Sequence, residues 1–231
     1  MRRYRDIALA LVIAFVILAV VGEVLVGTFG HTVVHEQDDL LGWKPRAHFS
    51  ARMKVRDQSG NEYEVDYSTG PNGFRTFGDT SGARKRVLFV GDSFTGDPNT
   101  SNGEAYFGVV GERLPVEVFA IGGSGYGTLQ ELLLVRQFVD IINPDIFVLQ
   151  YCTNDISDNS FQLEGRMSHV RNQKNLRPYL IEDSIAFRLP KYHPYLLLIN
   201  NSRLFRKLDF EVMKLQYRFD DPTRLLGPEA P

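Results

Sequence analysis

The sequence predicts an α/β fold: a three-layer α/β/α sandwich around a parallel sheet, preceded by one transmembrane helix and a small β hairpin. Three short apolar runs, at residues 87–90, 116–121 and 146–149, are separated by stretches with helical spacing. Strands that are apolar on both faces are typical of a parallel sheet covered by helices. Each run ends in a polar or glycine-rich cluster, and in such sheets ligands bind beyond the carboxyl ends of the strands.

Composition limits the classes of protein to consider. The chain has 231 residues and a formal net charge of −2, which suits one globular domain plus an appendage. The balance of charges gives no basic excess, so nucleic acid is not an expected partner. Cys152 is the one cysteine, so no disulfide can form within the chain.

The amino terminus predicts a membrane anchor over residues 1–30. Three arginines within the first five residues precede a stretch, residues 7–29, in which Glu23 is the one charged residue. Roughly 20 apolar residues are enough to cross a bilayer as a helix. The arginines favour a cytoplasmic start, which would place the rest of the chain on the extracytoplasmic side. A cleaved signal peptide and a buried core helix are the alternatives, although no clear A-x-A-like cleavage site follows.

A connector and a hairpin are expected between the anchor and the α/β domain, over residues 31–83. Residues 31–50 read as a connector next to the membrane. Residues 49–55 and 63–67 alternate apolar and polar side chains around a Ser-Gly-Asn turn, which indicates a β hairpin. Residues 69–82 are rich in Gly, Pro, Asn and Ser and are expected to form a loop.

The α/β domain is expected over residues 84–231. Residues 104–114 fit a helix between the first two strands, and residues 128–142 have helical spacing and end at Asn-Pro. After Asp155 the pattern weakens. The later segments are read as irregular at 160–190, short and apolar at 195–199, helical at 204–217, and loop at 220–231.

Ser93, Gly125 and Asn154 are the candidate site residues, because each follows one of the three predicted strands. A serine at a strand-to-helix turn exposes its hydroxyl, which becomes a nucleophile when a base takes its proton. Backbone N–H groups and an asparagine amide stabilise the oxyanion that forms when such a serine attacks a carbonyl. This combination indicates acyl-transfer chemistry.

Three blocks around these residues resemble the SGNH hydrolase (GDSL-like lipase/esterase) family. The blocks are Val-Gly-Asp-Ser-Phe-Thr at 90–95, Ala-Ile-Gly-Gly-Ser-Gly-Tyr-Gly at 120–127 and Cys-Thr-Asn-Asp at 152–155. Their order and spacing also match, and the resemblance covers about a third of the chain, residues 84–159.

The resemblance implies a role for each of these residues. Ser93 would be the nucleophile and its own N–H an oxyanion donor, while Gly125 would give a backbone N–H and Asn154 a side-chain N–H. Asp92 and Asp155 would position these loops. The family needs no cofactor, and no Cys/His cluster in the sequence has the spacing of metal ligands.

The sequence departs from the family pattern in three places. Ala120 stands where many relatives carry Asn, and Cys152 replaces the usual glycine of the third block. The family's D-x-x-H block, which supplies the catalytic base, does not occur among the sequences around the five histidines: His31, His35, His48, His169 and His193. We therefore expect the domain to be incomplete at its carboxyl end.

The function expected from these observations is that of a serine esterase acting on O-acyl esters, or an acyltransferase, with envelope glycan or lipid esters as substrates. The alternative is an inactive membrane-tethered binding module or a truncated fragment. Other readings stay open: Ser93 as a helix cap, a dinucleotide site at the glycine run, Cys152 as a nucleophile or a small buried hydrophobe, and His193 as a distant base.

Overall fold

The computed structural model describes most of the chain in two units. The described residues are 2–29, 34–57, 59–96, 98–166, 176–189, 202–205, 207, 208 and 212. One unit is Val33–Lys191, and the other joins Met1–Thr32 to Tyr192–Pro231. Several predicted features lie outside the described residues: His31, His169, His193, the segments 195–199 and 220–231, and most of 204–217.

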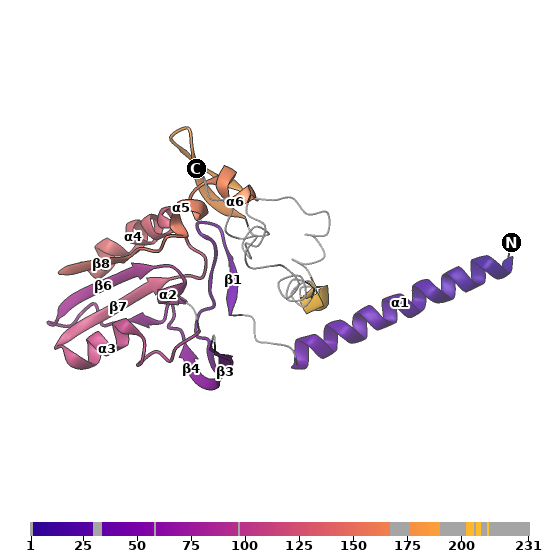
Figure 1. Cartoon of the computed structure of the whole chain (residues 1–231), viewed down its shortest axis with the longest axis horizontal. Helices are drawn as coiled ribbons and strands as arrows, with labels where there is room; N and C mark the ends of the chain where they lie inside the picture. Colours follow the sequence, from indigo (N-terminus) through magenta and orange to yellow (C-terminus); the bar gives the residue numbers. More distant parts are fainter. Residues whose placement is uncertain are drawn as a thin grey trace. The chain divides into compact units, whose positions relative to one another are not determined.

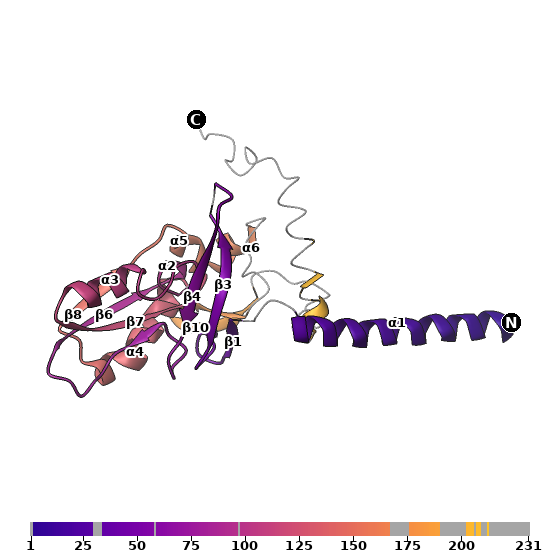
Figure 2. The ribbon, with the colours of Figure 1, turned by 90° about the horizontal axis from the view of Figure 1, so that it is seen from below.

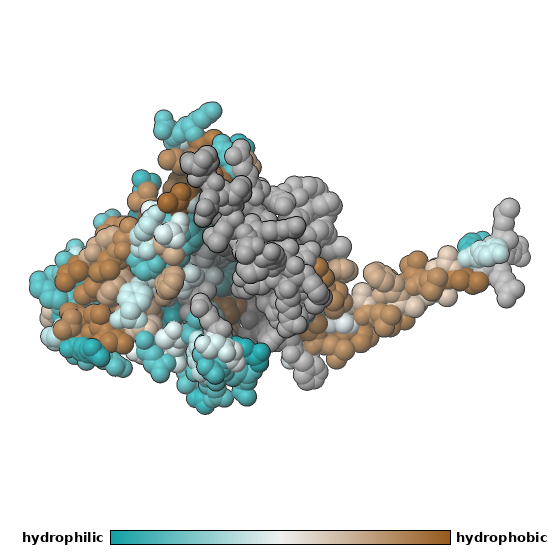
Figure 3. All heavy atoms as spheres, in the orientation of Figure 1, coloured by the Kyte–Doolittle hydropathy of each residue, from teal (hydrophilic) through white to brown (hydrophobic). Residues whose placement is uncertain are grey.

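The unit that joins Met1–Thr32 to Tyr192–Pro231 contains a long apolar helix, α1 (Arg2–Phe29). The face of α1 seen in Figure 3 is apolar over most of its length, and most side chains from Leu11 to Leu18 are large, apolar and exposed. Residues 4–28 are long and apolar enough to cross a membrane. The prediction of an N-terminal apolar helix is therefore confirmed.

Glu23, the charged residue near the end of α1, is satisfied by backbone and side-chain donors of the same unit. Its carboxylate accepts hydrogen bonds from the hydroxyl of Ser202 at 2.6 Å and from the N–H groups of Arg203 at 2.7 Å and Leu204 at 3.1 Å. A charge next to an apolar span is costly unless it is hydrogen-bonded. These donors reduce that cost.

The second unit, Val33–Lys191, contains a mixed sheet of four strands in the order β5-β7-β6-β8 (Figure 1). The three predicted runs form its parallel strands, β6 (Lys85–Gly91), β7 (Val116–Gly122) and β8 (Ile146–Gln150). A short strand from the predicted loop, β5 (Thr76–Phe77), pairs antiparallel with β7. The fold is therefore α/β, as predicted.

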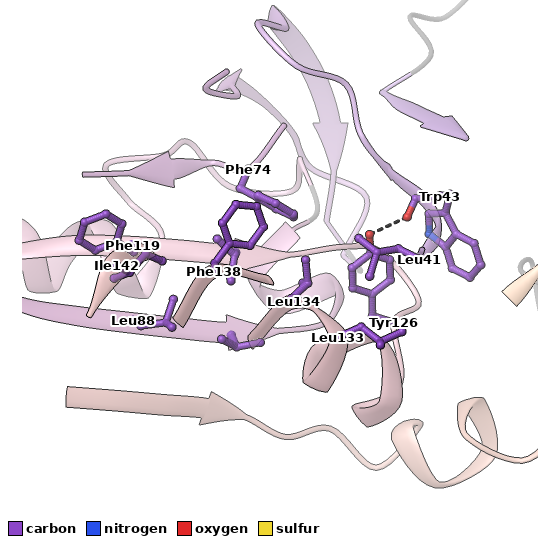
Figure 4. Close-up of a cluster of buried hydrophobic side chains, with 12 residues drawn as sticks. Leu41, Trp43, Phe74, Leu88, Phe119, Tyr126, Leu133, Leu134, Phe138 and Ile142 are labelled. Carbon is purple, nitrogen blue, oxygen red and sulfur yellow. Dashed lines mark hydrogen bonds between the residues drawn. The ribbon is translucent and has the colours of Figure 1, made fainter. Parts of the chain in front are cut away.

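Two helices cover opposite faces of this sheet. Alternate side chains of a strand point to opposite sides, and those of β6 therefore contribute to two separate cores. Leu88 and Val90 of β6 pack against α4 (Thr128–Ile142), in the cluster shown in Figure 4. Val87 and Phe89 pack on the other side, with α3 (Tyr106–Arg113). The described part of the unit also contains three short helices, α2 (Ser93–Gly96), α5 (Asp155–Asp158) and α6 (Phe161–Arg166).

Among the described residues, three antiparallel hairpins lie outside the main sheet. The predicted hairpin is formed by β3 (Ser50–Arg56) and β4 (Glu62–Ser68), seen in Figure 2. The expected connector contains a second, β1 (His35–Asp38) with β2 (Gly42–Pro45). The segment expected to be irregular contains a third, β9 (Arg177–Ile181) with β10 (Ser184–Arg188).

The β1–β2 hairpin forms where a connector was expected because its residues are buried against α4 and against residues 122–127, which run from the end of β7 to the start of α4 and are called here the glycine-rich loop. Leu41 and Trp43 are 2% and 6% exposed and belong to the main apolar core. The hydroxyl of Tyr126 donates a hydrogen bond to the carbonyl of Trp43 at 2.6 Å (Figure 4). The amide of Gln130 donates to the carbonyl of Leu41, also at 2.6 Å.

Candidate active site

The three predicted site residues follow strands that end side by side. Gly91 at the end of β6 pairs with Gly122 of β7 on one side and with Gln150 of β8 on the other. Ser93, Gly125 and Asn154 come two, three and four residues after these paired ends, as counted along the sequence. The sheet therefore places all three at the edge formed by the carboxyl ends of its parallel strands. Ser93 follows β6, which lies between β7 and β8.

Ser93 begins α2 directly after the buried Asp92 and is itself half-buried. The carboxylate of Asp92 accepts a hydrogen bond from the N–H of Phe94 at 3.0 Å, which fixes the turn. The hydroxyl of Ser93 lies 3.5 Å from the other carboxylate oxygen of Asp92, so this contact is weak. In the described part of the chain, the backbone N–H of Ser93 donates no hydrogen bond.

Glycines allow the strand ends to approach each other closely. A Cβ atom at Gly122 would lie 2.3 Å from the carbonyl oxygen of Gly91 and 3.0 Å from the side chain of Thr95. The first distance is far inside van der Waals contact. The close approach of the Ser93 turn to the glycine-rich loop therefore requires that position 122 has no side chain.

Gly125 has a φ of 69°, in the left-handed region that glycine adopts without strain. Its N–H donates no hydrogen bond to any residue that the structure describes. Its carbonyl accepts a hydrogen bond from Arg177, and the carbonyl of the preceding Ser124 accepts one from the indole of Trp43 at 2.9 Å. The loop is thus held by its carbonyls while the Gly125 N–H remains free.

Asn154 stands at the start of α5, where its side-chain amide donates a hydrogen bond to Asp158 at 3.0 Å. A primary amide carries two hydrogens, so this contact leaves one available. Asn154 is half-buried, as Ser93 and Gly125 are. All three candidate residues therefore keep an N–H group that the described structure does not use.

Buried acids surround this edge of the sheet. Burial raises the pKa values of Asp155 and Asp158, and the charge of Asp92 adds to both effects. Burial, with smaller contributions from Asp155 and Asp92, raises the pKa of Glu131 to about 8. Both carboxylate oxygens of Glu131 are buried without a partner among the described residues, so Glu131 is mostly a neutral acid at pH 7.

The described residues include no group of three or more His, Cys, Asp or Glu side chains that could hold a metal ion. Cys152 is a half-buried free cysteine whose N–H donates to Asp155 at 3.1 Å. His35 lies in β1, where burial lowers its pKa, and His48 lies two residues before β3. Neither histidine belongs to the three strand ends that carry the candidate residues.

Two residues that contact this edge were not singled out in the sequence. Trp43 lies in the segment expected to be a connector. The signal available in the sequence was that Leu41 and Trp43 are large apolar residues in a polar stretch, and both are buried. Arg177 gave no signal, because a charged residue in a polar segment is ordinarily exposed. Both residues reach the glycine-rich loop from a distant part of the sequence.

The arrangement suits the stabilisation of a developing negative charge beside a serine hydroxyl. Two backbone N–H groups and one amide are available at one edge, and they are neutral donors of the type that stabilise oxyanions. In comparisons with known proteins, no family model and no curated protein matches this chain.

Proposed function

We propose that this chain is a membrane-anchored serine esterase of the SGNH hydrolase type, with the sheet and its helices forming a three-layer α/β/α sandwich. It would hydrolyse O-acyl esters through an acyl intermediate on Ser93, or transfer the acyl group to another hydroxyl. The observation that carries the proposal is the placement of Ser93, Gly125 and Asn154 at the ends of three adjacent parallel strands, each with an unused N–H.

The chemistry follows from these groups. The Ser93 oxygen attacks the ester carbonyl, its proton passes to a base, and the carbonyl oxygen becomes an oxyanion held by the N–H groups of Ser93, Gly125 and Asn154. Collapse of this intermediate releases the alcohol, which takes up a proton, and leaves Ser93 acylated. Attack by water then releases the acid, whereas attack by a sugar or lipid hydroxyl completes a transfer.

The base is not assigned to a residue. In the family that the sequence resembles, a D-x-x-H block supplies it, and no such block occurs in the sequence. This observation favours a second candidate function: a membrane-tethered module that keeps the acyl-binding edge but binds esters without cleaving them. Loss of a triad member leaves only the contributions of the oxyanion hole and substrate binding, so the two candidates differ greatly in rate.

The location proposed for the domain is the extracytoplasmic side of the membrane. Three arginines precede the apolar part of α1, and positive charges favour the cytoplasmic side of a span. Esters carried by envelope glycans or lipids are the substrates available there. A lipid or a polymer attached to the envelope is also a substrate that a tethered enzyme reaches without diffusing away.

The proposal is tested by ester hydrolysis with the full chain in detergent micelles. We expect the parent protein to hydrolyse p-nitrophenyl acetate and Ser93→Ala to lose this activity. Ser124→Ala is the matched control, because Ser124 is a half-buried serine of the neighbouring loop whose backbone, not its hydroxyl, makes the contact with Trp43. An active Ser93→Ala variant would contradict the assignment of Ser93 as the nucleophile. An inactive parent that still binds acetylated glycans would favour the binding module.

A further inference from the structure

Arg177 is a fully buried cation, 0% exposed, whose guanidinium contacts several segments of its unit. Its five N–H groups form a planar fork that suits several acceptors at once. Besides the Gly125 carbonyl, it bonds Gln130 at 3.2 Å, and it forms ion pairs with Glu164 at 2.7 Å and Asp158 at 3.3 Å. A buried charge is tolerated only with such a set of partners.

Trp43 packs against the same guanidinium. The guanidinium carbon of Arg177 lies 5.1 Å from the centre of the Trp43 ring, within the range of a cation–π contact. The Tyr126 hydroxyl donates a hydrogen bond to the backbone carbonyl of Trp43 at 2.6 Å and so holds the backbone of that residue in place. Arg177 and Trp43 therefore act on the glycine-rich loop as one packed pair.

The Trp43 contact determines where the Gly125 N–H points. The carbonyl of Ser124 and the N–H of Gly125 belong to the same peptide unit, which is planar and trans, so the two groups point in opposite directions. The indole N–H donates to that carbonyl at 2.9 Å. A donor fixed on the carbonyl side therefore directs the Gly125 N–H away from Trp43 and leaves it free to bind an acceptor.

The Arg177 contact fixes the next peptide unit. Its guanidinium donates to the carbonyl of Gly125 itself. Gly125 has the left-handed φ of 69°, and glycine exchanges between left-handed and right-handed conformations at little cost. With the carbonyls on both sides of its Cα held by separate donors, Gly125 has one orientation available.

Arg177 also acts on the third candidate residue, through Asp158. One carboxylate oxygen of Asp158 pairs with Arg177 at 3.3 Å, and the other accepts the hydrogen bond from the Asn154 amide at 3.0 Å. A carboxylate held at one oxygen presents the other in a fixed place. The side chain of Asn154 is therefore oriented by the same guanidinium that holds Gly125.

We propose that Arg177 and Trp43 are positioning residues that hold the Gly125 N–H and the Asn154 amide in the geometry of an oxyanion site. This inference rests on the proposed function and adds the residues that support it. Neither side chain needs to touch the substrate, because each acts through a hydrogen bond to a residue of the site. Misplacement of a group by about 1 Å can cost on the order of a hundredfold in rate.

Three variants separate this role from general stability. Trp43→Phe keeps a ring under the guanidinium but loses the donor to Ser124. Arg177→Lys keeps the charge but lacks the planar fork, so it cannot hold all of its acceptors. Tyr63→Phe is the control, because it also removes one hydrogen-bond donor to a backbone carbonyl, that of Asn99, but lies in β4, away from Arg177 and Trp43.

The first measurement is the reaction of Ser93 with a fluorophosphonate in the full chain in micelles, resolved into binding and bond-forming constants. We expect Trp43→Phe and Arg177→Lys to lower the bond-forming constant about tenfold to a hundredfold and Tyr63→Phe to leave it within about twofold of the parent. Equal bond-forming constants in the parent and Trp43→Phe would overturn the positioning role. Trp43→Phe decides the question even if Arg177→Lys does not fold.

The second measurement does not depend on activity. Amide hydrogen exchange, read by mass spectrometry over residues 122–127, is expected to accelerate in Trp43→Phe and to stay unchanged in Tyr63→Phe. Unchanged exchange in Trp43→Phe would contradict the inference that this side chain holds the loop. If the parent fails to react with the fluorophosphonate, the proposed function falls, while the exchange data still decide whether Trp43 fixes the Gly125 peptide.

Discussion

The indole N–H of Trp43 donates a hydrogen bond to the carbonyl oxygen of Ser124 at 2.9 Å, across 81 positions of the sequence. This contact makes the β1–β2 hairpin part of the candidate site, because the peptide that carries the Ser124 carbonyl also carries the Gly125 N–H. The segment between α1 and the sheet therefore supports the candidate site as well as linking the two.

The hydrogen bond from Tyr126 to the Trp43 carbonyl is predicted to stabilise this arrangement measurably. Tyr126→Phe would leave the carbonyl without its partner in a buried position, at a cost of about 1–3 kcal/mol in the free energy of unfolding. Tyr63→Phe is the matched control, because Tyr63 also donates its hydroxyl to a carbonyl but is 40% exposed. Urea unfolding of both variants measures the difference, and equal stabilities would contradict the prediction.

Gly122→Ala is predicted to disrupt the packing between the Ser93 turn and the glycine-rich loop. The added Cβ would lie 2.3 Å from the Gly91 carbonyl oxygen, so the strand ends must separate. Overpacking of this kind typically costs about 1–3 kcal/mol or more. Gly70→Ala provides the comparison, since its Cβ would meet nothing closer than 3.7 Å. Thermal unfolding should show a lower Tm for Gly122→Ala and an unchanged Tm for Gly70→Ala. An unchanged Tm for Gly122→Ala would contradict the close approach of Gly91 and Gly122.

Glu131 is predicted to make the folded unit less stable as the pH rises. Its pKa is raised to about 8 by burial and by the charges of Asp155 and Asp92, whereas an exposed glutamate titrates near 4.3. Between these values the folded protein keeps a proton that the unfolded chain has lost. Stability is therefore full below about pH 4 and falls by up to about 1.4 kcal/mol per pH unit as the pH rises toward 8.

The measurement for Glu131 is urea unfolding at pH 6 and pH 8 in the parent and in Glu131→Gln. The glutamine stays neutral, so the variant should lose less stability than the parent across this interval. Glu104→Gln, at an exposed turn position two residues before α3, should keep the parent's pH dependence. An identical pH dependence in the parent and Glu131→Gln would show that the Glu131 carboxyl titrates normally.

The apolar helix α1 is predicted to hold the chain in membranes. Arginine at both Ile13 and Val16 would place two charges in the middle of the apolar span, at a cost of about 2.5–3.5 kcal/mol each. The parent should remain in the membrane fraction after alkaline carbonate extraction, and the double variant should appear in the supernatant. Tyr4→Arg, at the end of the span, should behave like the parent. Extraction of the parent by carbonate would contradict a membrane span.

The sequence allowed the three parallel strands of the main sheet and the helices α3 and α4 to be predicted, because their signals are local. The run at residues 87–90 is β6, and the spacing of residues 128–142 matches α4 from Thr128 to Ile142. An apolar strand or an amphipathic helix carries its own pattern, whatever it packs against. Parallel strands place their carboxyl ends on the same side of a sheet, which is why Ser93, Gly125 and Asn154 could be grouped before the structure was known.

The β1–β2 and β9–β10 hairpins could not be predicted, because long-range contacts stabilise them. Trp43 is buried by Tyr126, and Arg177 by acids and carbonyls that are 13 to 52 positions distant in the sequence. No local pattern marks a buried arginine, since an isolated charge is normally at the surface. The supports of the site were therefore hidden in the segments that looked irregular.

The most direct test of the central claim is to locate the adduct formed when the full chain reacts with a fluorophosphonate. After digestion, peptide mass spectrometry identifies the modified residue. We predict modification at Ser93, its loss in Ser93→Ala, and its retention in Ser124→Ala. Modification of another serine, or a folded parent chain that takes up no probe, would contradict the proposal that Ser93 is the nucleophile of this site.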